Sequence, residues 1–187
     1  SGEAGSGDLL AAGSTGSGTI TNGAAVLRGV LSNPASGTHD FSGTIANGGT
    51  GAMVFVKQGA GTQILSGNNT YTGFTRVEGG TLVLTGSNSM ADTTTVAAGL
   101  LDVRNSNALG TGNVSVRALG AGVQLQGGIT IPNNFITSND GSGASGFAIA
   151  NVSGDNTITG TISLTDGAGN TVIDRKSTRL NSSHRIR

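Results

Sequence analysis

Residues 59–86 read GAGTQILSGNNTYTGFTRVEGGTLVLTG, and this stretch decides the fold class of the chain. Short runs of apolar residues and threonine alternate here with corners of glycine and asparagine. Alternation with a period of two indicates half-buried β-strands, and Gly and Asn tolerate the positive φ angles of tight corners. The stretch therefore predicts successive strands of a parallel β-solenoid, each turning one narrow apolar stripe inward.

The composition fits a thin, repetitive core. The 187 residues include 34 Gly, against a usual share of about 7%, and only 2 Pro. Hydrophobic residues make up 35% of the chain and aromatic residues 3%, too little for a thick globular core, while a charged fraction of 11% argues against ordinary disorder. Cysteine is absent, which excludes disulfides and thiolate metal sites.

The two-residue period recurs along the chain. It is clearest at residues 81–85, 113–117, 122–126 and 160–165, and weaker at residues 25–28, 53–57, 100–104, 128–131, 147–149 and 171–173. No run shows a helical period, so we expect an all-β chain that turns about every ten residues. The side chains predicted to point inward are Leu65, Val77, Leu82, Leu84, Val114, Val116, Val123, Leu125, Ile162 and Leu164.

Strands at this spacing fit two architectures. Adjacent hairpins would form a sandwich, whereas corners that do not reverse the chain would form a coil of parallel strands. Residues 67–73 (GNNTYTG) resemble residues 154–160 (GDNTITG), and recurrence of one unit favours the coil. With about 22 residues in each three-sided turn, residues 1–174 predict roughly eight turns. The asparagines expected at corners, where a side-chain amide can bond the backbone, are Asn68, Asn69 and Asn156.

The last residues are excluded from fold reasoning. From Asp174 the chain reads DRKSTRLNSSH, which resembles the in-frame translation of a common sequencing adapter, so residues 175–187 are interpreted as a non-native, disordered tail. The alternative is a native basic tail that binds an acidic partner. Without the tail, five basic residues remain against ten acidic ones, a net charge of −5 that gives no support to nucleic-acid binding. The basic residues of the tail are Arg175, Lys176, Arg179, Arg185 and Arg187.

The chain has no initiator methionine and no apolar run near the roughly 18 residues of a membrane helix. We therefore expect residues 1–174 to be an internal fragment of a longer reading frame, with no direct insertion into a membrane.

Residues suited to catalysis or ligand binding occur only as isolated signals. His39 beside Asp40 could form a general-base pair, but both follow a loop-like PASG run, and a solvated loop pair is the preferred interpretation. Residues 139–141 (NDG) could offer oxygen ligands to calcium, yet no GGxGxD repeat occurs, and the GxG runs at 120–122 and 141–143 lack a P-loop lysine. We expect no catalytic, cofactor-binding or metal site and no cofactor. The scattered aspartates are Asp92, Asp102, Asp140, Asp155 and Asp166.

Residues 59–86 closely resemble the passenger-associated, or autotransporter-associated, β-strand repeat, whose usual form is GxGTLxLSGxNTYTGGTxVxxGTLxL. A looser resemblance reaches from residue 41 to about residue 116. Gln63 stands where an apolar residue is usual, and Phe74 replaces the second Gly of TGG, so we expect a weakened core position and an irregular turn there. The residues that the resemblance assigns to the structural repeat are Gly59, Gly61, Thr62, Leu65, Ser66, Gly67, Asn69, Thr70, Tyr71, Thr72, Gly73, Thr75, Val77, Gly80, Thr81, Leu82 and Leu84.

The resemblance implies a right-handed parallel β-helix in a secreted or outer-membrane-anchored protein of the bacterial cell surface. Passengers of this family are exported unfolded and usually precede a C-terminal translocator barrel, so the implied partners are further turns of the same polypeptide and that barrel. The preferred interpretation is a non-enzymatic stalk or spacer that supports passenger folding during export. The alternatives are an adhesin or self-association surface that contacts a host or neighbouring cell, and, less favoured, a polysaccharide-degrading β-helix enzyme.

Overall fold

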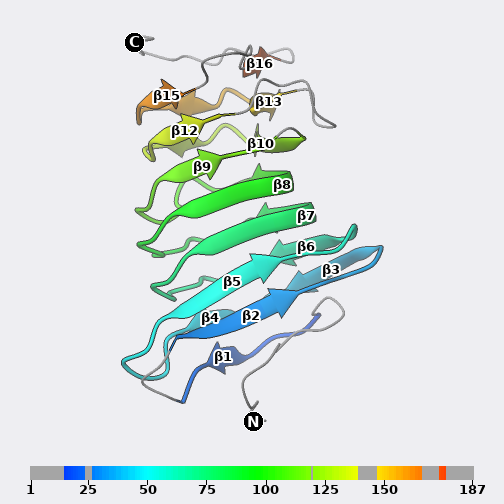
Figure 1. Cartoon of the computed structure of the whole chain (residues 1–187), viewed down its shortest axis with the longest axis vertical. Helices are drawn as coiled ribbons and strands as arrows, with labels where there is room; N and C mark the ends of the chain where they lie inside the picture. Colours follow the sequence, from blue (N-terminus) through cyan, green and yellow to red (C-terminus); the bar gives the residue numbers. More distant parts are fainter. Residues whose placement is uncertain (1–14, 24–26, 119, 139–146, 166–172, 176–187) are drawn as a thin grey trace.

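The chain folds into an all-β parallel solenoid. A computed structural model describes residues 15–23, 27–118, 120–138, 147–165 and 173–175. Within these residues the regular elements are all β-strands, and each strand pairing recorded among them is parallel. Parallel pairing confirms the coil and excludes the hairpin sandwich. The strands follow one another along the longest axis of the molecule, from β1 to β16 (Figure 1).

Each turn contributes to three faces. The first face contains β2 (Arg28–Ser32), β5 (Met53–Lys57), the first halves of β7 (Thr75–Leu84) and β8 (Thr94–Val103), β9 (Val114–Val116), β12 (Phe135–Thr137) and β15 (Ile162–Leu164). The second contains β3 (Thr38–Phe41), β6 (Thr62–Leu65), the second halves of β7 and β8, β10 (Ala121–Gln126), β13 (Ile149–Ser153) and β16 (Ile173–Arg175). The third contains β1 (Thr19–Thr21), β4 (Thr44–Ala46), β11 (Thr130–Ile131) and β14 (Thr157–Ile158).

The described residues form about six turns, so the predicted count of eight is not confirmed. Turn length varies along the chain, because the step from Thr75 to its partner Thr94 is shorter than the step from Phe135 to its partner Ile162. The single average length assumed for all turns is therefore too short for the longer ones. The handedness of the coil stays a prediction.

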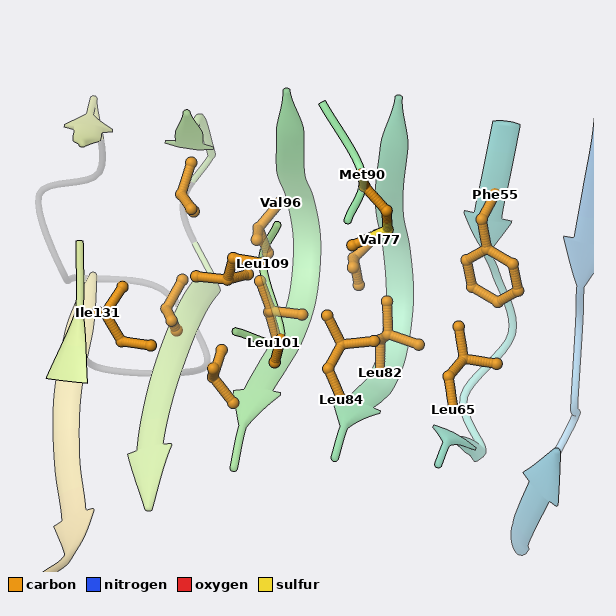
Figure 2. Close-up of a cluster of buried hydrophobic side chains, with 14 of the residues drawn as sticks. Phe55, Leu65, Val77, Leu82, Leu84, Met90, Val96, Leu101, Leu109 and Ile131 are labelled. Carbon is orange, nitrogen blue, oxygen red and sulfur yellow. The ribbon is translucent and has the colours of Figure 1, made fainter. Parts of the chain in front are cut away.

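The core is a column of apolar side chains enclosed by the three faces. Leu65 pairs with Leu84, and Leu84 with Val103, so equivalent residues of successive turns stack on one another. Figure 2 shows this stacking from Phe55 toward Ile131. The predicted inward residues that are fully buried are Leu65, Val77, Leu82, Leu84, Val114, Val116, Val123 and Leu125.

The prediction for β15 is only partly right. Ile162 packs against the core, but Leu164 is 37% exposed, so the expected burial of Leu164 is wrong. Leu164 pairs with Thr137, which is fully buried, and it therefore occupies an inward position of the register. Alternation reports which way a side chain faces, whereas burial also needs a covering turn on each side. β15 is the last strand of the first face within the described residues.

Some strand limits also differ from the sequence pattern. Of the run at residues 25–28, residues 25 and 26 lie outside the described residues, Leu27 is 60% exposed and Arg28 begins β2. The strands that alternation did not predict, among them β3, β4, β12 and β14, have two to four residues, too few to show a period. Of residues 171–173, only Ile173 is described. β16 ends at Arg175, and residues 176–187 lie outside the described residues, so the tail assignment stays a prediction.

Candidate functional site

A buried asparagine ties adjacent turns together between β6 and β7. Asn69 is fully buried, and its Oδ1 atom accepts a hydrogen bond of 2.9 Å from the backbone N–H of Ile45 in the preceding turn. The N–H of Thr70 in turn donates to the carbonyl of Ile45 at 2.9 Å. The side chain of Asn69 and the backbone of Thr70 thus bond both the N–H and the carbonyl of Ile45 in the neighbouring turn, an arrangement that we call an asparagine clasp.

The asparagine clasp occurs three times in the described part of the chain. The Oδ1 atom of Asn88 accepts from the N–H of Asn69 at 2.8 Å, and that of Asn156 accepts from the N–H of Ile129 at 2.9 Å. In both cases the residue after the asparagine donates its N–H to the carbonyl of that same partner residue, from Ser89 to Asn69 at 3.0 Å and from Thr157 to Ile129 at 2.8 Å. The same device therefore serves turns far apart along the shaft.

Asparagine suits this position because its amide both donates and accepts. The Nδ2 atom of Asn69 donates to the carbonyl of Gly67 at 3.0 Å, and that of Asn88 donates to the carbonyl of Ala108 at 2.7 Å. The Nδ2 atom of Asn156 donates to the carbonyl of Leu125 at 3.1 Å. A buried polar group is tolerated when it is hydrogen-bonded, and each clasp meets that condition.

Sequence reasoning located two of the three clasps. Asn69 and Asn156 bond the backbone at corners, as expected, and they occupy the same place in GNNT and GDNT. Asn68 also bonds the backbone, but from the exposed surface, where its Oδ1 accepts from the N–H of Ser87 at 2.8 Å. Sequence reasoning missed Asn88. The same number of positions that separates Thr75 from its partner Thr94 also separates GNNT at 67–70 from GSNS at 86–89, and this correspondence could have revealed the clasp of Asn88.

The other repeat residues fall into inward, outward and corner positions. Tyr71 is fully buried, its hydroxyl lies 2.5 Å from Thr75 Oγ1, and burial raises the pKa of Tyr71 well above its usual value. Thr75 Oγ1 also donates to the sulfur of Met90 at 3.5 Å. The threonine and serine residues of the repeat that lie outside the core are half-buried or exposed. They are Thr62, Ser66, Thr70, Thr72 and Thr81.

Two corner glycines are required by close approach of the neighbouring turn. Gly80 has φ +57°, and a Cβ atom there would lie 2.3 Å from the carbonyl oxygen of Gly61. A Cβ atom at Gly73 would lie 2.4 Å from the carbonyl oxygen of Met53. The next residue, Phe74, is 37% exposed, so the second glycine of the usual TGG can be replaced by a bulky side chain.

Gln63 does not produce the irregular turn that was expected. Its strand pairs regularly with β3 and with β7, and the register shifts of β7 lie between Val77 and Thr81 instead. Gln63 is fully buried, and its Oε1 accepts from Ser32 Oγ at 2.9 Å while its Nε2 donates to the carbonyl of His39 at 3.2 Å. At Gln63 the turn is therefore regular, and the polar side chain finds partners inside the solenoid.

His39 and Asp40 do not form a catalytic pair. Both lie in β3 rather than in a loop, and adjacent strand residues point to opposite faces. His39 Nε2 lies 3.2 Å from the carbonyl oxygen of Ser36, and Asp40 Oδ1 accepts from Ser66 Oγ at 2.6 Å. The expected solvated loop is wrong, and the two side chains bond different neighbours.

Asp102 is an acidic side chain that is buried and hydrogen-bonded to two other side chains. It is buried in β8, and its Oδ2 accepts from Arg104 at 2.7 Å and from Gln126 at 2.9 Å. Its Oδ1 has no hydrogen-bond partner in the structure. The pKa of Arg104 is raised, mainly by its hydrogen bond to Asp102. The recorded contacts of this carboxylate among the described residues are with one guanidinium and one amide.

No cluster suited to a metal ion is present in the part of the chain that the structure describes. The same residues contain no helix that is long and apolar enough to cross a membrane. The candidate segments 139–141 and 141–143 lie outside the described residues, as does Asp166. Ala121 begins β10 directly after Gly120, so the GxG run at 120–122 enters a strand and not the helix that a phosphate loop requires.

A comparison with protein families matches two ranges of the chain, and each contains one clasp asparagine. The model of the Passenger-associated-transport-repeat matches residues 55–83 and again residues 79–103. The first match contains Asn69 and the second contains Asn88. The chain carries passenger-associated transport repeats. In a β-solenoid such repeats are typical of autotransporter passengers.

The passenger repeat implies a larger autotransporter polypeptide that is secreted or displayed at the surface, and it suggests a non-catalytic segment. The clasp of Asn156 lies beyond both matched ranges, so this arrangement extends further along the chain than the repeat model does. No matching relative was found among characterised proteins or solved structures.

Proposed function

We propose that this segment is a stalk or spacer of a surface-displayed, outer-membrane-anchored passenger and that it supports folding of the passenger during export. The observation that carries the proposal is the recurrence of the asparagine clasp. Each clasp joins one turn only to the next, so a turn that emerges from the membrane can close on its neighbour without waiting for distant parts of the chain.

The use of polar side chains supports the same role. The buried asparagines satisfy backbone groups of adjacent turns, and the recorded ion pairs, Arg76 with Glu78 and Arg104 with Asp102, join residues two positions apart in the sequence. Polar groups thus serve stacking and local pairing. A spacer needs continuity of the shaft and no particular outward side chain.

A spacer should tolerate loss of one complete turn. Deletion of residues 61–79 removes the length of one turn and joins Ala60 to Gly80, which leaves Ile45 opposite Asn88, an asparagine that offers the same acceptor. Expressed within its full polypeptide, this variant should reach the cell surface and resist external protease as the unaltered protein does.

The control is deletion of residues 61–69, about half a turn, which removes Asn69 and breaks the register of every later turn. We expect poor display and rapid proteolysis for this control. If the whole-turn deletion folds and is displayed but loses an activity of the passenger, residues 61–79 carry a specific site, and the spacer proposal is wrong.

A further inference from the structure

Three polar side chains interrupt the core at the corner between β5 and β6. Ser32, Lys57 and Gln63 are each fully buried, and we call them the polar junction. The next turn holds Val77 at the place of Lys57 and Leu82 at the place of Gln63. Figure 2 shows these two apolar side chains within the stacked column. The apolar stacking of later turns is therefore absent at the polar junction.

Lys57 brings a charge into this corner without a carboxylate partner. Its Nζ atom donates to the carbonyls of Gln58, of Gly59 at 2.9 Å and of Gly79 at 3.2 Å. Neither ion pair recorded within the described residues includes Lys57. Burial lowers the pKa of Lys57 to about 8, because removing the ammonium from water disfavours its charged form.

Charged groups around this corner are engaged elsewhere or lie on other strands. Glu78 accepts from Gln58 Nε2 at 2.6 Å and pairs with Arg76 at 2.6 Å. β6 carries no titratable side chain. The titratable groups on the strands packed against β5 and β6 are Arg28, His39, Asp40, Arg76 and Glu78.

The length of the turns changes at the same place. Thr62 pairs with Thr38 of the preceding turn and with Thr81 of the following one, and the step back to Thr38 is longer than the step on to Thr81. The first passenger repeat begins at residue 55. A longer and a shorter step therefore meet at the turn that contains β5 and β6. The hydrogen bond from Ser32 to Gln63 joins this turn to the preceding one, and the bond from Lys57 to Gly79 joins it to the turn of β7.

We propose that the polar junction is a built-in opening point of the shaft. The turns up to and including β5 and β6 detach there as a unit from the turn of β7 and hydrate Lys57, while the turns from β7 onward stay closed. In a solenoid each turn contacts only its neighbours, so stability is a sum of turn and interface contributions, and the weakest interface opens first. The hydrogen bond from Lys57 to Gly79 crosses this interface and keeps the two turns in register when the interface is closed.

Native-state hydrogen exchange of the full chain tests this proposal. The N–H of Phe55 donates across the interface to Phe74 at 3.0 Å, and the N–H of Thr94 occupies the same column and donates to Asn113 at 2.9 Å. We expect Phe55 to be protected about tenfold less than Thr94 at neutral pH, because it exchanges through the local opening. Equal protection of the two amides would overturn the proposal.

Removal of the buried charge should abolish the difference in exchange protection between Phe55 and Thr94. In the double variant Lys57→Met and Gln63→Leu, the protection of Phe55 should approach that of Thr94, a gain of about tenfold. The matched control is Thr94→Val, which also replaces a buried polar side chain by an apolar one, but within the turns that stay closed. The control should leave Phe55 poorly protected. A double variant that folds without protecting Phe55 would contradict the proposal.

The pH dependence of the unaltered chain decides the matter if the double variant does not fold. The open form hydrates Lys57 and restores its ordinary affinity for a proton, so protonation favours opening and deprotonation favours closure. The protection of Phe55 relative to Thr94 should therefore increase from about pH 7 to about pH 9.5. A ratio that does not change with pH would show that Lys57 does not drive the opening.

Discussion

The Oδ1 atom of Asn88 accepts two hydrogen bonds from Asn69, one from its backbone N–H at 2.8 Å and one from its side-chain amide at 3.1 Å. Asn69 in turn accepts from the N–H of Ile45 at 2.9 Å. Three consecutive turns are thus linked by side-chain oxygens, in addition to the backbone ladder. Loss of the Asn69 side chain removes the bond to Ile45 and one of the two bonds to Asn88, while the backbone N–H of residue 69 still donates to Asn88.

Replacement of Asn69 by alanine should destabilise the solenoid. It leaves the N–H of Ile45 without its acceptor inside the structure, and an unsatisfied buried group costs about 1–3 kcal/mol. With the lost bond to Asn88, we expect the free energy of unfolding in urea to fall by about 2–4 kcal/mol. Asn68→Ala, on the exposed side of the corner, should cost about 0.5 kcal/mol. Equal urea midpoints would show that the clasp contributes nothing.

Asn156 should behave like Asn69, although it lies outside the matched repeats. Asn156→Ala removes the acceptor for Ile129 and should lower the unfolding free energy by about 1–3 kcal/mol. The neighbouring Asp155→Ala alters an exposed residue and should change stability by less than about 0.5 kcal/mol. Thermal unfolding of both variants is the measurement, and a larger loss for Asp155→Ala would contradict a shared clasp.

Two leucines of equal sequence pattern should differ in their effect. Leu84 is fully buried, so Leu84→Ala should cost about 2–5 kcal/mol through lost burial and a cavity. Leu164 is 37% exposed, and Leu164→Ala should cost less than about 1 kcal/mol. Urea unfolding followed by circular dichroism separates the two. Similar losses would mean that β15 is covered as fully as β7.

Substitutions at residues 73 and 74 should show whether close approach of the neighbouring turn or agreement with the usual repeat sequence decides stability at this corner. Gly73→Ala places a methyl group 2.4 Å from the carbonyl oxygen of Met53, so the backbone must shift, and we expect a loss of about 1–3 kcal/mol. Phe74→Gly restores the usual TGG but acts at a half-exposed position, and it should change stability by about 1 kcal/mol or less. The comparison uses melting temperatures, and a reversed order would refute the steric account.

Stability should pass through a maximum on the alkaline side. The folded pKa of Lys57, about 8, lies below its ordinary value of 10.5, so the unfolded chain binds more protons between these values and stability rises with pH. The folded pKa of Tyr71 lies above its ordinary value of 10.0, so stability falls as pH rises beyond 10. Urea titrations from pH 7 to pH 11 check both slopes. Lys57→Met should remove the rise, and Tyr71→Phe the fall.

Local pattern predicted much of the scaffold. Leu82 and Leu84 alternate within one strand, and their burial follows from that alternation once the chain coils. The two copies of G-[ND]-N-T located the clasps of Asn69 and Asn156 because both keep the same corner chemistry. Asn88 escaped because GSNS differs from GNNT at two of four positions, although its side chain makes the same bonds.

By itself the sequence determined an all-β coil with a thin apolar core, because period-two alternation and glycine corners are properties of neighbouring residues. Only the tertiary structure decided which residues of successive turns meet. The bonds from Asn69 to Asn88 and from Ser32 to Gln63 join residues 19 and 31 positions apart, and the varying length of the turns sets these encounters. The burial of Lys57 and the exposure of Leu164 have the same origin, since both depend on the turn that lies next to them.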